Sequence, residues 1–204
     1  MIEVEIRGKI KDFEKTLEEF RKKAKFIQEK KRISFVYFRH DVCKDVREVK
    51  NEKLDLRARI TNGKAELIIK HGDWSGSDSR REISLPIELE SFEEALDFLK
   101  FLDWNKGVIV TTDTFLFDYK GIEFAVVKNK HFNYFEAEKL TKDRKDIDKI
   151  NKEILGVCKE FNLEPFSEEE FINQLNVLNN IEENQFDFAK QNLSYFKEKF
   201  KEYF

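Results

Sequence analysis

The sequence has little cysteine and no long apolar segment. Its 204 residues include two cysteines, Cys43 and Cys158, which we expect to be ordinary reduced thiols because structural disulfides are uncommon inside cells. No run of 18 apolar residues is present, so the sequence predicts no transmembrane helix and no membrane partner. The chain opens on a charged, strand-like segment that lacks the pattern of a signal peptide, and we therefore expect a cytoplasmic protein.

The sequence also lacks a strong charge of one sign. It carries 38 basic and 41 acidic residues, for a formal net charge of −3, so no global field favours nucleic acid and we expect none as a partner. Gly63-Lys64 and Gly72 do not form the GxxxxGK pattern of a P-loop, and the three histidines are not spaced with the cysteines as a zinc site. These absences leave a folded, soluble domain whose 21 phenylalanines can fill a core.

The first 140 residues alternate apolar and polar side chains in a way typical of β-strands. Ile2, Val4 and Ile6 alternate with charged residues, and Asn62-Gly63 between two alternating stretches is a strong hairpin signal. The pattern predicts eight strands over residues 2–7, 26–39, 54–60, 65–70, 80–87, 108–119, 122–127 and 132–140. It predicts two amphipathic helices over residues 11–25 and 91–103, the second opened by a Ser91 and Glu94 capping box.

From Thr141 the apolar period changes from two to about 3.6 residues. Ile147, Ile150 and Ile154 share one helical face, and Ser167 with Glu170 forms a second capping box that opens a further helical segment. The sequence therefore predicts a helical C-terminal extension over residues 141–204, packed on the body of the protein or on a second subunit. The sequence leaves open whether the protein forms a homodimer.

Two acidic pairs stand at the ends of the β-rich part, Glu3-Val4-Glu5 and Glu136-Ala137-Glu138. Residues two apart on a strand point to the same face, so each pair directs two carboxylates into one space, and four such groups need cations. Chance produces isolated pairs of this kind in a chain so acidic, and a surface ion pair or a solvated strand face explains single members equally well. The order of the whole set indicates a shared interior, because four basic side chains lie between the two acidic pairs in the sequence: Arg57, Arg59, Lys70 and Arg80.

The ordered set resembles the CYTH family, also called triphosphate tunnel metalloenzymes, which includes class IV adenylate cyclases, thiamine triphosphatases and inorganic triphosphatases. Glu3-Val4-Glu5-Ile6-Arg7 resembles the family's ExExK with arginine in the last position, and Arg57-Ala58-Arg59 with Lys70 resembles its phosphate-binding strands. Arg80-Arg81-Glu82 resembles the RxE strand, and Glu136-Ala137-Glu138 the closing ExE. The resemblance covers residues 1 to about 140.

The resemblance implies an α+β fold, in which an eight-stranded antiparallel β-barrel forms a triphosphate tunnel with flanking helices and a helical C-terminal extension. The implied domains are a tunnel barrel over residues 1–140 and the extension over residues 141–204. The implied activity is metal-dependent hydrolysis of a small-molecule triphosphate, either inorganic tripolyphosphate, thiamine triphosphate or a nucleoside triphosphate. A class IV-type adenylate cyclase and a non-catalytic module that binds polyphosphate or nucleotide remain as alternatives.

The resemblance also assigns roles to residues. The phosphate-binding residues would be Arg7, Arg57, Arg59, Lys70 and Arg80, and the ligands of Mg²⁺ or Mn²⁺ would be Glu3, Glu5, Glu136 and Glu138. The catalytic candidates that could orient the attacking water are Glu5, Glu123 and Glu138. Two departures from the family pattern are visible: Thr112 and Thr114 stand near a position where the family has a basic pair, and Ala125 stands near its penultimate-strand aspartate. Glu123, two residues earlier on the same face, is the expected replacement.

Overall fold

The computed structural model describes residues 2–39, 45–47, 54–71 and 81–204. The expected acidic and basic segments fall on regular strands, except that Arg80 lies outside the described residues together with Cys43. The strands and helices are, in chain order, β1 (Ile2–Lys9), α1 (Phe13–Lys23), β2 (Lys25–Phe38), β3 (Leu54–Thr61), β4 (Lys64–His71), β5 (Arg81–Ile87), α2 (Phe92–Phe101), β6 (Lys106–Tyr119), β7 (Ile122–Lys128), β8 (Tyr134–Thr141), α3 (Ile147–Glu160), β9 (Glu164–Pro165), α4 (Glu168–Asn179), β10 (Gln185–Asp187) and α5 (Leu193–Lys199).

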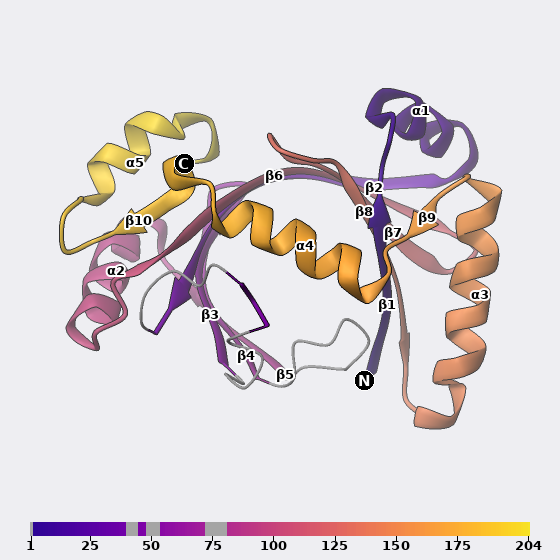
Figure 1. Ribbon diagram of the computed structural model, residues 1–204, viewed down its shortest axis with the longest axis horizontal. Helices are drawn as coiled ribbons and strands as arrows, with labels where there is room; N and C mark the ends of the chain where they lie inside the picture. The colour runs from indigo at the N-terminus through magenta and orange to yellow at the C-terminus, as the bar shows by residue number, and fades with distance from the viewer. Residues whose placement is uncertain (1, 40–44, 48–53, 72–80) are drawn as a thin grey trace. The chain divides into compact units, whose positions relative to one another are not determined.

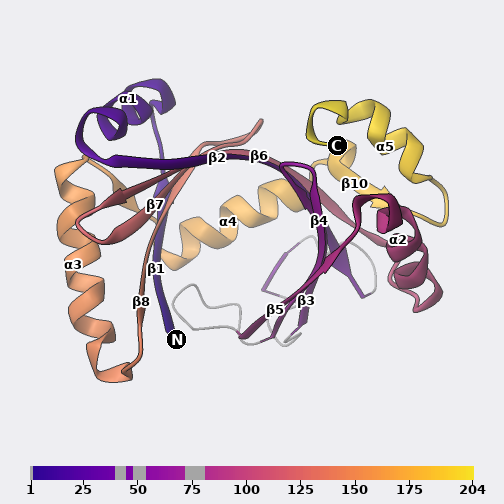
Figure 2. The same ribbon diagram turned by 180° about the vertical axis from the view of Figure 1, so that it is seen from behind.

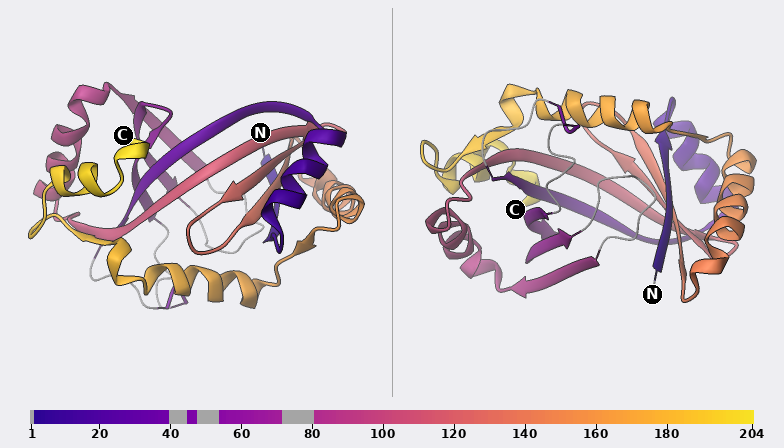
Figure 3. Two further views of the ribbon diagram at one scale, coloured as in Figure 1. Left: turned by 90° about the horizontal axis from the view of Figure 1, so that it is seen from above. Right: turned by 60° about the horizontal axis from the view of Figure 1, so that its bottom comes forward.

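The strands form one antiparallel sheet in the order β5-β4-β3-β2-β6-β7-β8-β1-β9, with β10 paired to β6. The prediction of an eight-stranded closed barrel is wrong in two respects: the sheet has ten strands, and no pairing among the described residues joins its two ends. The predicted mixed α+β class and the flanking helices are confirmed. The two long strands β2 and β6 are neighbours in the sheet and run side by side (Figure 3).

The two prolines of the chain lie in the two strands that end the sheet. Pro86 belongs to β5 and Pro165 to β9. Proline has no backbone N–H to donate, so it is tolerated on an edge strand and disfavoured inside a sheet. Since β9 pairs with β1 at Gly8 and Lys9, it covers part of the β1 edge that closure of a barrel would use.

The chain forms two compact units. The first contains β1, α1, β7, β8, β9 and α3, and its core is the outer face of the sheet packed under the two helices. Figure 1 shows α3 running alongside β1 and β8. Phenylalanine dominates this core: Phe20 of α1 is fully buried, and its ring stacks on Phe161 with the centroids 4.0 Å apart.

The second unit contains β3, β4, β5, α2, β10 and α5. The strands β3, β4 and β5 lie next to one another, as Figure 2 shows. On one face of these strands, Phe35 meets Phe186 and Phe196 in edge-to-face contacts at 5.4 and 5.8 Å. The sheet residues Ala58 and Ile60 are fully buried in the same core.

Two tight turns fix the pairing of neighbouring strands. Asn62 and Gly63 have positive φ angles of 49° and 74°, and they join β3 to β4 so that Thr61 faces Lys64. Lys120 and Gly121 have φ angles of 56° and 73° and join β6 to β7 in the same way. Two-residue turns of this hand match the twist of the strands that they connect. The predicted Asn-Gly hairpin is confirmed.

The C-terminal part is mainly helical, as predicted, but it also contributes the two short strands β9 and β10 to the sheet. Thus β9 pairs with β1, and β10 pairs with β6 at Gly107 and Val108. Cys158 of α3 is buried with a free thiol, and burial raises the pKa of this thiol to about 12. None of the helices in the described part of the chain is long and apolar enough to cross a membrane.

One of the two predicted capping boxes is present and the other is absent. Ahead of α4, the Glu170 carboxylate accepts hydrogen bonds from the Ser167 backbone N–H and hydroxyl, both at 2.8 Å, and the Ser167 Oγ accepts from the Glu170 N–H at 3.2 Å. Ser91 makes no side-chain cap to α2. A short 3-10 turn over Leu89–Ser91 precedes α2 and holds Ser91 at φ −88°, ψ 4°, away from the extended geometry that such a cap requires.

The two serines therefore provide a matched test of capping. We expect Ser167→Ala to lower the free energy of unfolding by about 1 kcal/mol, because the Glu170 backbone N–H loses its acceptor and the Glu170 carboxylate loses the hydrogen bond from the Ser167 hydroxyl. Ser91→Ala should change it by less than about 0.5 kcal/mol. Urea denaturation followed by circular dichroism measures both variants, and equal losses would contradict the assignment of the cap.

Candidate functional site

The acidic residues of the first unit lie in one row across four adjacent strands. In the antiparallel register Asp118 faces Glu123, Glu123 faces Glu138, and Glu138 faces Glu5. Directly opposed residues point to the same face of a sheet, so these four carboxylates, which we call the acidic row, share one face. The other face is the apolar core under α1 and α3. The sequence predicted three of the four members and missed Asp118.

Glu138 is the most strongly perturbed member of the acidic row. The pKa of Glu138 is raised to about 8. Partial burial is the largest cause, followed by the charge of Glu3, a hydrogen bond with Glu3, and the charges of Glu123 and Glu5. Like charges that approach one another disfavour ionisation, so one of them keeps a proton. Without a cation, the group around Glu138 therefore holds a proton at neutral pH.

Arg7 bridges two of the acidic strands. Its guanidinium contacts both carboxylate oxygens of Glu5 at 2.7 Å, and its Nε donates to Glu136 Oε1 at 3.0 Å. Burial alone would lower the pKa of Arg7, but Glu136 and Glu5 outweigh it and raise the pKa above the ordinary arginine value. The ring of Phe171 lies 5.4 Å from the guanidinium carbon. Arg7 was predicted to bind phosphate, and in this structure it holds Glu5 and Glu136 in place.

The next set of opposed residues on this face, two positions along the strands, is less polar than the family pattern predicts. Leu116 faces Ala125, which faces Glu136, so the sheet register confirms that Ala125 shares a face with the acids without contributing one. Thr114 lies on this face too, and Thr112 lies two residues further along β6; both are buried. The Glu123 carboxylate, opposite Glu138, is the acid that the strand supplies instead.

The basic residues of the second unit also share a face, and each has a carboxylate partner. Arg57 contacts Asp55 through two hydrogen bonds of 2.8 and 2.6 Å, and the Asp55 side chain is 1% exposed. Arg59 donates from Nε to Glu66 Oε1 at 2.9 Å. Asp55 lies on the same strand as Arg57, and Glu66 faces Arg59 across the hairpin.

Lys70 completes this basic face. Its ammonium lies 2.7 Å from Glu82 of β5, which the register places directly opposite. Burial would raise the pKa of Glu82, but the hydrogen bond and the charge of Lys70, with smaller contributions from Arg59 and Arg57, lower it. The three cations are thus matched by three carboxylates, and an anion that binds here competes with internal partners. The sequence alone did not predict these partners.

A family model described as CYTH domain matches residues 1–172. The chain belongs to the CYTH domain family. No curated protein matches it. The resemblance seen in the ordered acidic and basic segments is confirmed, and the match extends into the C-terminal helical part.

Solved structures of similar fold cover most of this CYTH chain. The protein PH1819 from Pyrococcus horikoshii OT3 is 21% identical over 85% of this chain and 97% of its own, with a TM-score of 0.68. A proposed adenylate cyclase from Vibrio parahaemolyticus is 15% identical over 85% and 98%, with a TM-score of 0.61. A proposed adenylyl cyclase from Hippeastrum, described as having a dominant triphosphatase activity, is 13% identical over 85% and 95%, with a TM-score of 0.54. At these identities the similarity shows the fold.

The acidic row of this CYTH protein has the donor chemistry of a divalent-cation site. Carboxylate oxygens are the hard ligands that Mg²⁺ and Mn²⁺ prefer, and partial burial together with the charges of Glu3, Glu123 and Glu5 raises the pKa of Glu138. No group of three or more His, Cys, Asp or Glu side chains within the described ranges is already arranged to hold a metal ion. The donor set therefore fits such a cation, with side-chain movement needed to converge on it.

The titration of Glu138 gives a pH prediction for the metal-free protein. Because the pKa of Glu138 is about 8 in the folded protein and 4.5 ordinarily, the folded state holds a proton that the unfolded chain releases between these values. The free energy of unfolding should therefore fall as pH rises from about 4.5 to 8, relative to a Glu138→Gln variant that cannot titrate.

The measurement is urea denaturation of both proteins in a chelator at several pH values from 5 to 8.5. We expect the stability of the wild type minus that of the variant to decrease with pH, and saturating Mg²⁺ at pH 8 to stabilise the wild type more than the variant. A difference that is constant with pH would show that Glu138 is not shifted.

Proposed function

We propose that this protein is a metal-dependent triphosphatase that cleaves a phosphoanhydride bond of a small-molecule triphosphate. The observation that carries the proposal is the acidic row, in which Glu5, Glu138 and Glu123 face one another across three strands of a CYTH sheet. A fold does not need four neighbouring carboxylates on one face, because their mutual repulsion opposes folding. Their collection is explained by a cation that the reaction uses.

The second unit supplies the phosphate-binding groups in this proposal. Arg57 and Arg59 have planar guanidinium groups that match phosphate oxygens bidentately, and Lys70 adds a mobile point charge. Substrate oxygens replace Asp55, Glu66 and Glu82 as partners of these cations. A triphosphate with about four negative charges can make this exchange, because two opposite unit charges about 4 Å apart attract by roughly 4 kcal/mol at an effective dielectric near 20.

The acidic residues of the first unit have two tasks in this proposal. Glu3, Glu5, Glu136 and Glu138 would hold Mg²⁺ or Mn²⁺, and such a cation would supply positive charge that neutralises the negative charge developing on the substrate. Glu123, at the centre of the row, accepts a hydrogen bond from the attacking water and orients it toward the terminal phosphorus. Arg7 keeps Glu5 and Glu136 in place through the contacts described above.

A substrate panel tests the activity. The protein is incubated with tripolyphosphate, thiamine triphosphate or ATP, in the presence of Mg²⁺, Mn²⁺ or a chelator, and phosphate, pyrophosphate and cyclic nucleotide are quantified. Metal-dependent phosphate release is the expected result. Pyrophosphate with cyclic AMP would instead establish an adenylate cyclase, the activity proposed for the Vibrio protein of similar fold.

The paired cations and the threonines Thr112 and Thr114 favour one further candidate, a module that binds a polyphosphate or nucleotide without turnover. If no substrate turns over while tripolyphosphate still raises the melting temperature, the binding module is correct and the triphosphatase is not.

The role of Glu123 is tested by Glu123→Gln. The amide keeps the shape of the side chain but is a poor proton acceptor, so kcat should fall by about 10² to 10⁴ with little change in KM. Glu153→Gln is the matched control, since Glu153 pairs with Lys139 on the core side of the sheet and its loss should leave kcat within about twofold. Full activity of the Glu123 variant would remove Glu123 from the mechanism.

The phosphate-binding face is tested by Arg59→Ala. Loss of a charge-assisted hydrogen bond should raise the substrate KM by a factor that corresponds to about 1.5 to 3 kcal/mol, with kcat less affected. Arg47→Ala is the control, because Arg47 is an exposed partner of Asp45 in the same unit. An unchanged KM in the Arg59 variant would contradict the assignment of this face.

A further inference from the structure

One half of the outer face of β4 and β5 is apolar and uncovered. The register places Ala65 opposite Ile87, Leu67 opposite Leu85, and Ile69 opposite Ile83, all on the face that packs under α2. Ala65 is 4% exposed at one end of this face. At the other end Ile69, Ile83 and Leu85 are 36, 52 and 58% exposed. The core of the second unit thus covers only part of its own sheet.

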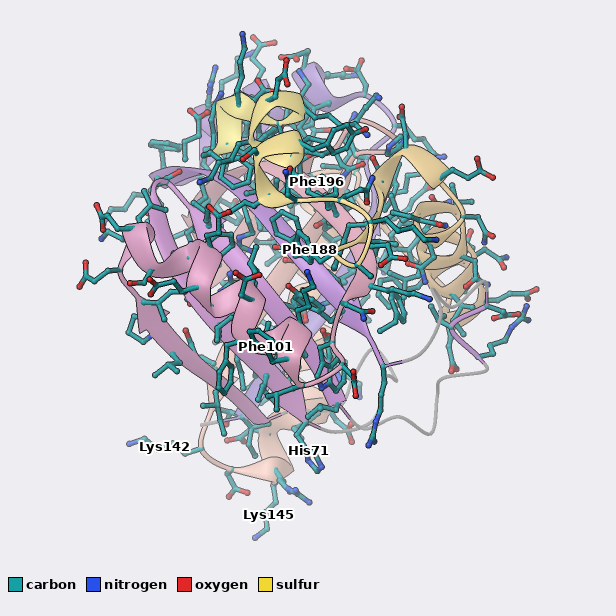
Figure 4. The ribbon with its side chains drawn as sticks, turned by 90° about the vertical axis from the view of Figure 1, so that its left-hand side faces the viewer. His71, Phe101, Lys142, Lys145, Phe188 and Phe196 are labelled. Carbon is teal, nitrogen blue, oxygen red and sulfur yellow. The ribbon has the colours of Figure 1, made fainter. Side chains whose placement is uncertain are left out.

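The helix that packs on this face is itself apolar on a second side. Its Phe92, Leu96 and Leu99 are buried in the core. On another side, Phe101 and Leu102 follow Phe98 by three and four residues, and Phe98, Phe101 and Leu102 are 61, 87 and 56% exposed. Figure 4 shows Phe101 at the C-terminal end of α2, apart from Phe188 and Phe196 in the core. An amphipathic helix that packs on one surface has no need of this second stripe.

These six side chains form what we call the α2–β5 patch: Ile69, Ile83, Leu85, Phe98, Phe101 and Leu102. From their exposed fractions and a side-chain area of roughly 150 to 200 Å², the patch exposes on the order of 600 Å² of apolar surface. The largest patch on a typical monomer is about 300 to 600 Å², and a stable interface buries about 800 Å² per partner including its polar rim. The patch therefore has the size of the apolar part of a subunit interface.

We infer that the α2–β5 patch is the interface of a twofold-symmetric homodimer. A second copy supplies both shapes that the contact needs, since the aromatic ridge of α2 on one subunit can pack on the flat sheet surface of the other, and the reverse. Asp97 and Lys100 flank Phe98 and Phe101 on α2 and carry opposite charges. A twofold arrangement can therefore place each opposite its counterpart, without a surplus of like charge.

The contact is made by faces and not by extension of the sheet. β5 ends the order of strands, which would allow a second β5 to add at its edge. Pro86 lies within β5 and removes a backbone donor, a common device against edge pairing. The exposed side chains of Ile83 and Leu85 remain free to pack against another surface.

The other exposed large apolar residues in the described part of the chain are spread over several elements: Phe26, Ile27, Leu54, Leu89, Leu140, Leu155, Val177 and Tyr195. Phe26 is 50% exposed on β2, Val177 53% on α4 and Tyr195 48% on α5. Single exposed apolar side chains are normal on monomeric proteins and need no partner. They provide controls for the patch.

The test is sedimentation velocity of the full chain between about 0.5 and 100 μM, for the wild type, Phe101→Glu and Val177→Glu. The wild type should sediment as a dimer. Phe101→Glu should weaken dimerisation by roughly 10² to 10³-fold, because an aromatic anchor is replaced by a charge in both subunits. Val177→Glu should dimerise as the wild type does. Circular dichroism and melting temperature show that each variant is folded, which the high exposure of both positions favours.

Three results would overturn the inference. A wild type that is monomeric at 100 μM excludes a stable homodimer and leaves the patch to another partner. A dimer that Phe101→Glu does not weaken has its interface elsewhere. Assembly that grows without limit as concentration rises excludes the closed, twofold contact. The outcome is independent of the proposed activity, because neither variant changes a member of the acidic row or of the basic face.

Discussion

The antiparallel register of β1, β8 and β7 is the constraint on which the acidic row depends. It sets Glu5, Glu138 and Glu123 opposite one another, while the residues between them enter the core with Phe135 and Ala137 fully buried. A shift of one residue would bury the carboxylates under α1 and α3 and expose the core. The free energy of apolar burial on one face therefore holds the repelling charges together on the other.

The two units balance their charges in different ways. In the first, Arg7 is bound to Glu5 and Glu136, whereas burial and the charges of Glu3, Glu123 and Glu5 raise the pKa of Glu138. In the second, Arg57, Arg59 and Lys70 have internal carboxylate partners. Without a ligand, like charges therefore lie close together in the first unit, while the cations of the second unit already have carboxylate partners. This asymmetry explains why a cation is expected to change stability through Glu138, whereas an anionic substrate has to exchange with existing ion pairs.

The sequence predicted the strands and the acidic and basic segments because alternation is a local property. It missed Glu66 and Asp118, although both follow from local signals. The Asn62-Gly63 turn fixes Arg59 opposite Glu66, and the Lys120-Gly121 turn fixes Asp118 opposite Glu123. The pairing of β1 with β8, separated by some 130 residues, has no local signal, and the same holds for β9, whose two residues cover the β1 edge. The closed barrel was predicted from family resemblance, which carries no information on such a short strand.

The composition of α2 shows how a sequence can contain a surface that its own fold does not explain. The side chains of Phe92, Leu96 and Leu99 are buried in the core, and a helix that packs on one sheet face needs no more apolar positions than these. Phe98 and Phe101 exceed that requirement, and substitution by polar residues at such exposed positions would not oppose folding. An apolar period that fits two opposite sides of one helix indicates two packing partners. The chain provides the first partner itself, and the exposed half of β4 and β5 beside it is a surface on which a second copy provides the other.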